Sequence, residues 1–232
     1  MANNPLLSRL PRFRRGAFGL FLTTVLTTVM LTDQPIAQQL VLNPGGVIGG
    51  EGVWQPLTAN VIFPDGQVAL LFGTLMVQWF LAGVLEDYWG TRKYLTLVIG
   101  CGIAGYVASV LLALGVDAVA TTPVGGSTPM DLAAVVAFGA FMGKKPLALG
   151  GVLTVSGRGL ATFVVVLSVI SPLLRGAPWP IVVPGVVAAL TALLVTTQPW
   201  RRLRKSGKLG GRRRGKRAAH LRVIRPDDEL LN

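Results

Sequence analysis

The sequence predicts an all-α polytopic membrane protein with six transmembrane helices. Apolar residues make up 51% of the 232-residue chain, and charged residues make up only 14%. The charges are nearly absent from long blocks and gather in loops and at both ends, which is how membrane proteins distribute them. Several apolar runs approach the length of about 17 to 25 residues that a helix needs to cross a bilayer. We therefore expect a helical membrane protein instead of a soluble domain.

The expected spans follow one another with polar or Gly/Pro-rich residues between them. They cover 17–31, 67–85, 94–116, 129–142, 160–174 and 180–197. The first, fourth and fifth are short for a full crossing, so their ends must extend into the flanks or lie in thinned bilayer. The chain then divides into a basic N-terminus (1–16), a six-span membrane domain (17–198) with a long outer loop (32–66), and a basic tail (199–232).

The connection between the second and third spans has the composition of a tight hairpin. Glu86 and Asp87 end the second apolar run, and the basic pair Arg92 and Lys93 begins the third. Gly90 lies between these pairs, and glycine readily adopts the backbone conformations that tight turns require. A connection this short predicts two antiparallel helices that lie side by side.

The basic residues predict the orientation. The N-terminus, the loops after the second and fourth spans, and the tail carry nearly all of them, and six crossings place these segments on one side. Basic loops mark the cytoplasmic side, so both termini are expected in the cytoplasm. This bias accounts for the net charge of +12, so nucleic-acid binding is not needed to explain it. Basic residues beside a membrane bind anionic lipid headgroups instead, and the tail offers Arg201, Arg202, Arg204 and Lys205 for this role.

The sequence argues against metal sites and cofactors. Cys101 is the single cysteine and His220 the single histidine, so neither an intrachain disulfide nor a Cys/His metal site is available. The long outer loop holds Trp54, which is expected to anchor the loop at the membrane interface or to contact a partner protein. A compact six-span plan suits a bacterial inner membrane.

Short motifs in this order resemble the rhomboid family of intramembrane serine proteases. The run WQPLT at 54–58, followed by Phe63, is similar to the Trp-Arg-x-x-Thr…Phe entry into that family's second helix. Glu86 and Gly90 match its Glu-x-x-x-Gly turn, and the Gly-Ala pair at 139–140 is similar to the end of its nucleophile motif. The resemblance implies a six-helix bundle with both ends inside, in which Glu86 is structural. Glu86 either accepts hydrogen bonds that hold the hairpin or pairs with a basic residue across the turn.

The resemblance also implies where a catalytic site belongs. Family members use a serine on the fourth helix, activated by a histidine on the sixth, because a serine hydroxyl is a poor nucleophile without a neighbouring base. A histidine and an asparagine on the second helix hold the oxyanion. In this chain, the oxyanion positions fall on Leu70 and Thr74, the serine position on Ser127 or Asp131, and the base on Val182 when Gly185 is aligned with the family's glycine.

The implied catalytic base is missing, which predicts a pseudoprotease. His220 lies in the basic tail, and none of the expected spans contains a histidine. We expect a protein that binds or scaffolds membrane proteins through its second and fifth helices and its outer loop, without cleaving them. Two alternatives stay open: an active protease that uses Ser127 with an unfamiliar base, and a structural subunit of a larger membrane complex.

Ser127 and Asp131 also have plainer interpretations. Both lie where the fourth span begins, and serine or aspartate there commonly caps the free backbone amides of a helix. Asp131 lies about one turn inside the span, where an ionisable residue is by default a functional candidate that contacts a client or partner. Gly139 and Gly185 are expected to be structural, because small residues let membrane helices approach closely.

Overall fold

The structure is a computed structural model, and it describes residues 13–31, 34–64, 67, 69–149 and 153–197. The chain divides into two compact units, 1–197 and 198–232. The described residues all belong to the first unit. The expected lipid-binding residues Arg201, Arg202, Arg204 and Lys205, together with His220, lie outside the described residues.

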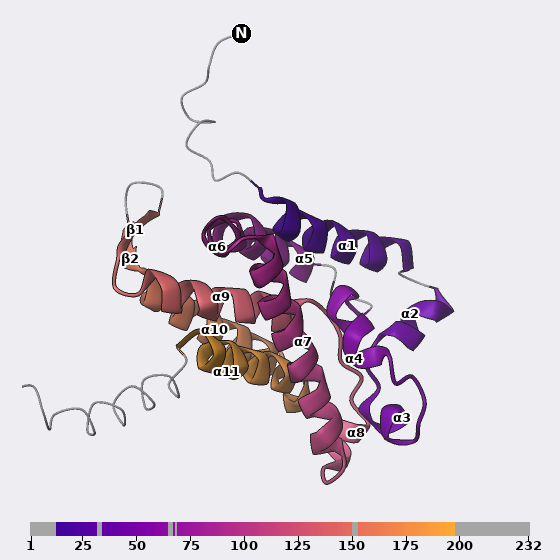
Figure 1. Cartoon of the computed structure of the whole chain (residues 1–232). Helices are drawn as coiled ribbons and strands as arrows, with labels where there is room; N and C mark the ends of the chain where they lie inside the picture. The colour runs from indigo at the N-terminus through magenta and orange to yellow at the C-terminus, as the bar shows by residue number, and fades with distance from the viewer. Residues whose placement is uncertain (1–12, 32–33, 65–66, 68, 150–152, 198–232) are drawn as a thin grey trace, which may run out of the picture. The chain divides into compact units, whose positions relative to one another are not determined.

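Six apolar helices account for the six expected spans (Figure 1). Four are long and apolar enough to cross a membrane: Leu70–Trp89, α7 (Thr91–Ala113), α10 (Gly157–Leu174) and Trp179–Thr197. Two are shorter, α1 (Arg15–Leu31) and α9 (Thr128–Met142). The helical membrane fold is therefore confirmed, while six crossings and cytoplasmic termini remain predictions.

Two of the long helices change their hydrogen-bonding pattern along their length. The second expected span runs from α5 (Leu70–Met76) through a π-helical segment, η3 (Val77–Ala82), into α6 (Gly83–Trp89). The last span begins as a 3₁₀ turn, η4 (Trp179–Val182), and continues as α11 (Val183–Thr197). The sequence does not predict the π segment. Such segments are often found at functional sites.

The centre of the bundle is α9. It packs against α7, α10, α11 and the η3 segment, and its buried residues include the whole stretch from Pro129 to Val135. A helix that is apolar over nearly its whole surface belongs inside a bundle, which agrees with the central place of α9. Close packing needs small residues: a Cβ at Gly139 would lie 2.4 Å from the Cβ of Ala161, and one at Gly185 would lie 2.9 Å from Leu132 Cδ1.

The turn between α6 and α7 is at Gly90. Its φ of +79° lies in the left-handed region, where residues with a Cβ are strained. The Gly90 amide donates to the Glu86 carbonyl and ends α6, while the Gly90 carbonyl accepts from Tyr94 N in the first turn of α7. One glycine therefore connects α6 to α7.

The outer loop contains short helices. They are α2 (Pro35–Leu40), α3 (Pro44–Ile48), α4 (Gln55–Thr58) and the 3₁₀ turn η2 (Ala59–Val61). Leu42 exchanges two 2.9 Å backbone hydrogen bonds with Val124, which follows the short helix α8 (Asp117–Ala120). The Gln55 side chain accepts from Asn43 N and donates to the Gln39 carbonyl. Trp54 precedes α4 and is 54% exposed, so its side chain is available to lipid or to a partner.

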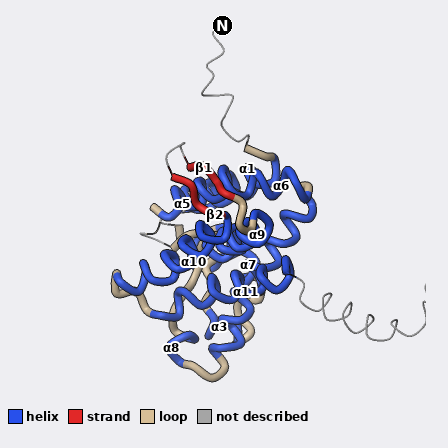
Figure 2. The backbone as a smooth tube through the Cα atoms, turned by 90° about the vertical axis from the view of Figure 1, so that its left-hand side faces the viewer, coloured by secondary structure: helices blue, strands red, loops and turns tan. Residues whose placement is uncertain are grey.

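A small β-hairpin departs from the all-α expectation. Its strands, β1 (Pro146–Leu149) and β2 (Leu153–Ser156), pair antiparallel with Leu149 opposite Leu153, and they are the red segments of Figure 2. The hairpin connects α9 to α10. Four-residue strands are too short for their side-chain alternation to be recognised beside long apolar helices.

Candidate functional site

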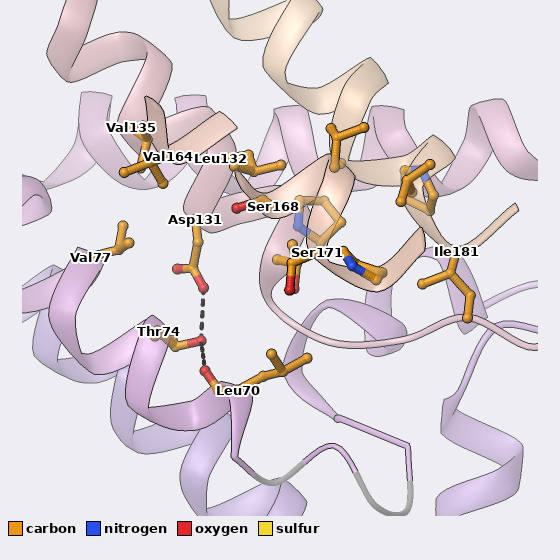
Figure 3. Close-up of a pocket in the computed structure, with 18 of the residues that line it drawn as sticks. Leu70, Thr74, Val77, Asp131, Leu132, Val135, Val164, Ser168, Ser171 and Ile181 are labelled. Atoms are coloured by element: carbon orange, nitrogen blue, oxygen red, sulfur yellow. Dashed lines mark hydrogen bonds between the residues drawn. The ribbon is translucent and has the colours of Figure 1, made fainter. Parts of the chain in front are cut away.

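A cavity of about 270 Å³ lies between the second and fifth expected spans. Its lining residues come from α5 and η3 on one wall, α10 on the opposite wall, and α9, η4 and α11 between them (Figure 3). Four positions carried over from the resemblance line it: Leu70, Thr74, Asp131 and Val182. The structure therefore brings together residues that are up to 112 positions apart in the sequence.

Asp131 is the centre of a buried hydrogen-bond cluster. Its Oδ2 atom accepts from the hydroxyls of Thr74 at 2.8 Å and Ser127 at 3.0 Å, and these two hydroxyl oxygens are themselves 2.8 Å apart. Its Oδ1 atom accepts from Gln78 Nε2 at 2.8 Å. Ser127 is 1% exposed and Asp131 is 8% exposed. The fourth span is thereby tied to the second through side chains alone.

Gln78 and Tyr94 extend the cluster to α7. The Tyr94 hydroxyl donates to Gln78 Oε1 at 2.5 Å, so Gln78 uses both ends of its amide. Neither residue was predicted to belong to the site. A signal was present, because Gln78 is a polar residue inside an apolar run and lies four positions after Thr74, on the same helix face.

The cap interpretation of Ser127 and Asp131 is wrong. Ser127 is the N-cap residue of α9, but its side chain makes no capping bond, and its backbone is already helical with φ −76° and ψ −1°. Its hydroxyl donates to the Asp131 carboxyl, and the bonds that this carboxyl accepts from described residues all come from side chains. Three donors within 3.0 Å therefore outcompete the backbone amides of the first turn.

The opposite wall carries two hydroxyls. Ser168 and Ser171 lie on α10 and line the cavity across from Thr74 and Asp131 (Figure 3). Much of the remaining lining is apolar, as Val77, Leu132 and Ile181 illustrate. The cavity is thus an apolar space with a few polar groups on two facing walls, a composition typical of ligand-binding pockets.

The positions implied for catalysis carry other chemistry. Val182, at the position of the base, has no group that accepts a proton, and Leu70 replaces an oxyanion donor with an apolar side chain. Ser127 is not among the residues that line the cavity. Among the described residues, no three His, Cys, Asp or Glu side chains gather closely enough to hold a metal ion.

Glu86 forms a second polar site, at the start of α1. Its carboxylate accepts from Gly16 N and Ala17 N, both at 2.9 Å, and from the Thr91 hydroxyl at 2.6 Å. The alternative pairing with Arg92 or Lys93 is not observed, because the backbone amides of α1 and Thr91 occupy this carboxylate. Its neighbour Asp87 pairs with Arg14 instead. Glu86 therefore connects three helices: α1, α6 and α7.

Comparison with known proteins identifies the family. No curated protein and no solved structure matches the chain. The model of a family described as eukaryotic integral membrane protein (DUF1751) matches residues 15–194. This match indicates a eukaryotic membrane, so the expectation of a bacterial inner membrane is wrong: a compact six-span plan does not distinguish the two hosts. Because the matched region extends from α1 into α11, the chain belongs to this family of eukaryotic integral membrane proteins.

Proposed function

We propose that this chain is a rhomboid-like membrane protein that binds membrane-spanning segments of other proteins without cleaving them. The observation that supports this function best is the cavity between the second and fifth spans. It lies where the resemblance implies an active site, yet its polar residues form a cluster in which each hydroxyl contacts the carboxyl or another hydroxyl. The proposal has two parts, absence of cleavage and binding of partner helices.

Absence of cleavage is supported by the environment of Ser127. Attack on a peptide carbonyl requires a hydroxyl that faces the substrate and a base that removes its proton. Ser127 is 1% exposed, and the residue at the position of the base is Val182. Asp131 is the proton acceptor nearest to the serine, but Gln78 and Thr74 also donate to it, so it is not paired with Ser127 alone.

Binding of partner helices is supported by the two apolar walls. Leu70 on α5 and Leu167 on α10 line the cavity from opposite sides and are 43% and 53% exposed. A volume of about 270 Å³ is too small for a helix but accommodates side chains that project from one. A partner helix placed between the two walls would fill the cavity with its side chains and cover these leucines.

Photo-crosslinking from inside the cavity tests the binding function. A photoreactive phenylalanine at Leu167 of the full chain, expressed in eukaryotic cells, is expected to form adducts with membrane proteins that mass spectrometry identifies. The same residue at Leu194, which is exposed on α11 and does not line the cavity, is the matched control. Adducts with lipid alone at both positions would refute the function.

The stoichiometry of the adducts separates the two binding alternatives. Several substoichiometric partners are expected for a protein that binds clients. One partner in equal amount would instead make the chain a structural subunit of a membrane complex.

A direct assay tests the absence of cleavage. The purified chain in lipid is expected neither to react with a serine-directed fluorophosphonate nor to cut a helical membrane substrate. Labelling or cleavage that disappears in Ser127→Ala would show that the chain is an active protease and would overturn this part of the proposal.

A further inference from the structure

We infer that the cavity receives a basic side chain, best a lysine, from the transmembrane helix of a partner, with Asp131 as its counter-charge. This inference rests on the proposed function and specifies which helices the chain selects. It follows from three observations: the charge of the cavity, the free acceptors on its walls, and its size.

The cavity carries an acidic group with no basic group to balance it. Among the described residues that line the cavity, Asp131 is the only Asp, Glu, Lys or Arg. Within the described part of the chain, the one ion pair joins Arg14 to Asp87 of α6, and neither residue lines the cavity. Ionisable side chains at membrane depth generally pair with an opposite charge. Since the described residues provide none here, the partner is the source that fits.

The acceptors that remain match an ammonium group. A carboxylate offers about four lone-pair sites. In Asp131, Oδ2 receives two hydroxyls and Oδ1 receives only the Gln78 amide, so Oδ1 has room for another donor. The hydroxyls of Ser168 and Ser171 make no hydrogen bond to a described residue, and both line the facing wall (Figure 3). An ammonium group brings three donors and no acceptor.

The size of the cavity favours a side chain that ends in a charge. Its volume of about 270 Å³ is bounded by apolar residues such as Val77, Leu132 and Val164. These suit the four-carbon stem of a lysine, while the ammonium group reaches Asp131. A leucine would fill the apolar part of the cavity and leave the Asp131 carboxyl without an opposite charge.

Binding of synthetic helices in lipid nanodiscs tests the inference. The probes are three apolar transmembrane peptides that differ at one central position, which is lysine, glutamine or leucine. A fluorophore is attached to Leu114→Cys in a Cys101→Ala background, and energy transfer between it and a label on the peptide reports binding. Leu114 is exposed at the end of α7 and does not line the cavity. We expect the lysine peptide to bind at least about tenfold more tightly than the leucine peptide.

Variants show whether Asp131 causes this preference. Asp131→Asn retains the shape of the side chain, and we expect the lysine and leucine peptides to bind it within about twofold of each other. Asp87→Asn removes the same charge outside the cavity and is expected to keep the preference. If Asp131→Asn does not fold, the pair Ser168→Ala and Ser171→Ala is expected to weaken binding of the lysine peptide alone.

The outcomes separate the two levels of the proposal. If no peptide binds the wild-type chain, the proposed function fails, and the inference fails with it. If all three peptides bind equally, helix binding is retained and only the selection of a basic residue is overturned. Equal binding of the glutamine and lysine peptides, both tighter than leucine, would show that the cavity recognises hydrogen bonding without charge, which also overturns the inference.

Discussion

Removing the Glu86 carboxylate should destabilise the protein more than removing any exposed charge. In Glu86→Ala, the amides of Gly16 and Ala17 lose their acceptor, and so does the Thr91 hydroxyl. Glu86 is buried, so water cannot readily replace it. The N-terminus of α1 would also lose a negative charge beside its free amides, where the helix dipole favours one.

The magnitude follows from the three hydrogen bonds. A hydrogen bond to a charged group contributes about 1.5–3 kcal/mol, and each buried donor left without a partner costs about 1–3 kcal/mol. Because these contributions overlap, we expect a loss of about 3–6 kcal/mol in the free energy of unfolding. Glu86→Gln keeps one acceptor oxygen and should lose about half as much.

Unfolding of the purified protein in lipid or mild detergent measures this effect. Asp87→Ala is the matched control, since Asp87 is the adjacent residue and forms a partly exposed pair with Arg14. It should change the free energy of unfolding by less than about 1 kcal/mol. Equal losses in Glu86→Ala and Asp87→Ala would refute the reasoning, because the buried carboxylate would then contribute no more than a surface charge.

Two further predictions concern α7. Gly105→Ala should destabilise the protein by about 1–3 kcal/mol, because the new Cβ would lie 2.3 Å from the backbone oxygen of Pro184. Gly100→Ala places its Cβ where no atom lies within 4 Å, so it should be neutral or slightly stabilising in the same unfolding assay. Similar losses in both variants would contradict the close approach of α7 and α11. Tyr94→Phe should cost about 1–3 kcal/mol by leaving the Gln78 oxygen without its donor, and a loss below 0.5 kcal/mol would show that this oxygen finds another partner.

The helices could be predicted from the sequence because each one depends on a continuous apolar run. Five predicted spans both begin and end within about three residues of the observed helices. The π segment η3 (Val77–Ala82) could not be predicted, because its residues are ordinary helix formers. Gln78, within this segment, is bonded to Asp131 and Tyr94 from other helices, so contacts that are distant in sequence accompany the altered local pattern.

The site was predicted in part. The resemblance pointed to positions on the second, fourth and sixth spans, and four of them line one cavity. Ser168 and Ser171 on the fifth span were missed, because single serines in an apolar helix are usually packing residues. The capping interpretation of Ser127 and Asp131 was wrong, because capping propensity describes an isolated helix end, whereas Thr74 and Gln78 approach this end from another helix.

The two possible registers of the nucleophile motif converge on one structural feature. Ser127 and Asp131 are four residues apart, and the Asp131 amide donates to the Ser127 carbonyl at 2.9 Å, as in a regular helical turn. Their side chains therefore lie on the same face of α9, and both reach Thr74, the position implied for an oxyanion donor. Either register places the nucleophile position in a group of acceptors and hydroxyls with no histidine. A binding function therefore follows from either alignment of the motif. Because Asp131 lines the cavity and Ser127 does not, substitution of Asp131 tests the binding function more directly.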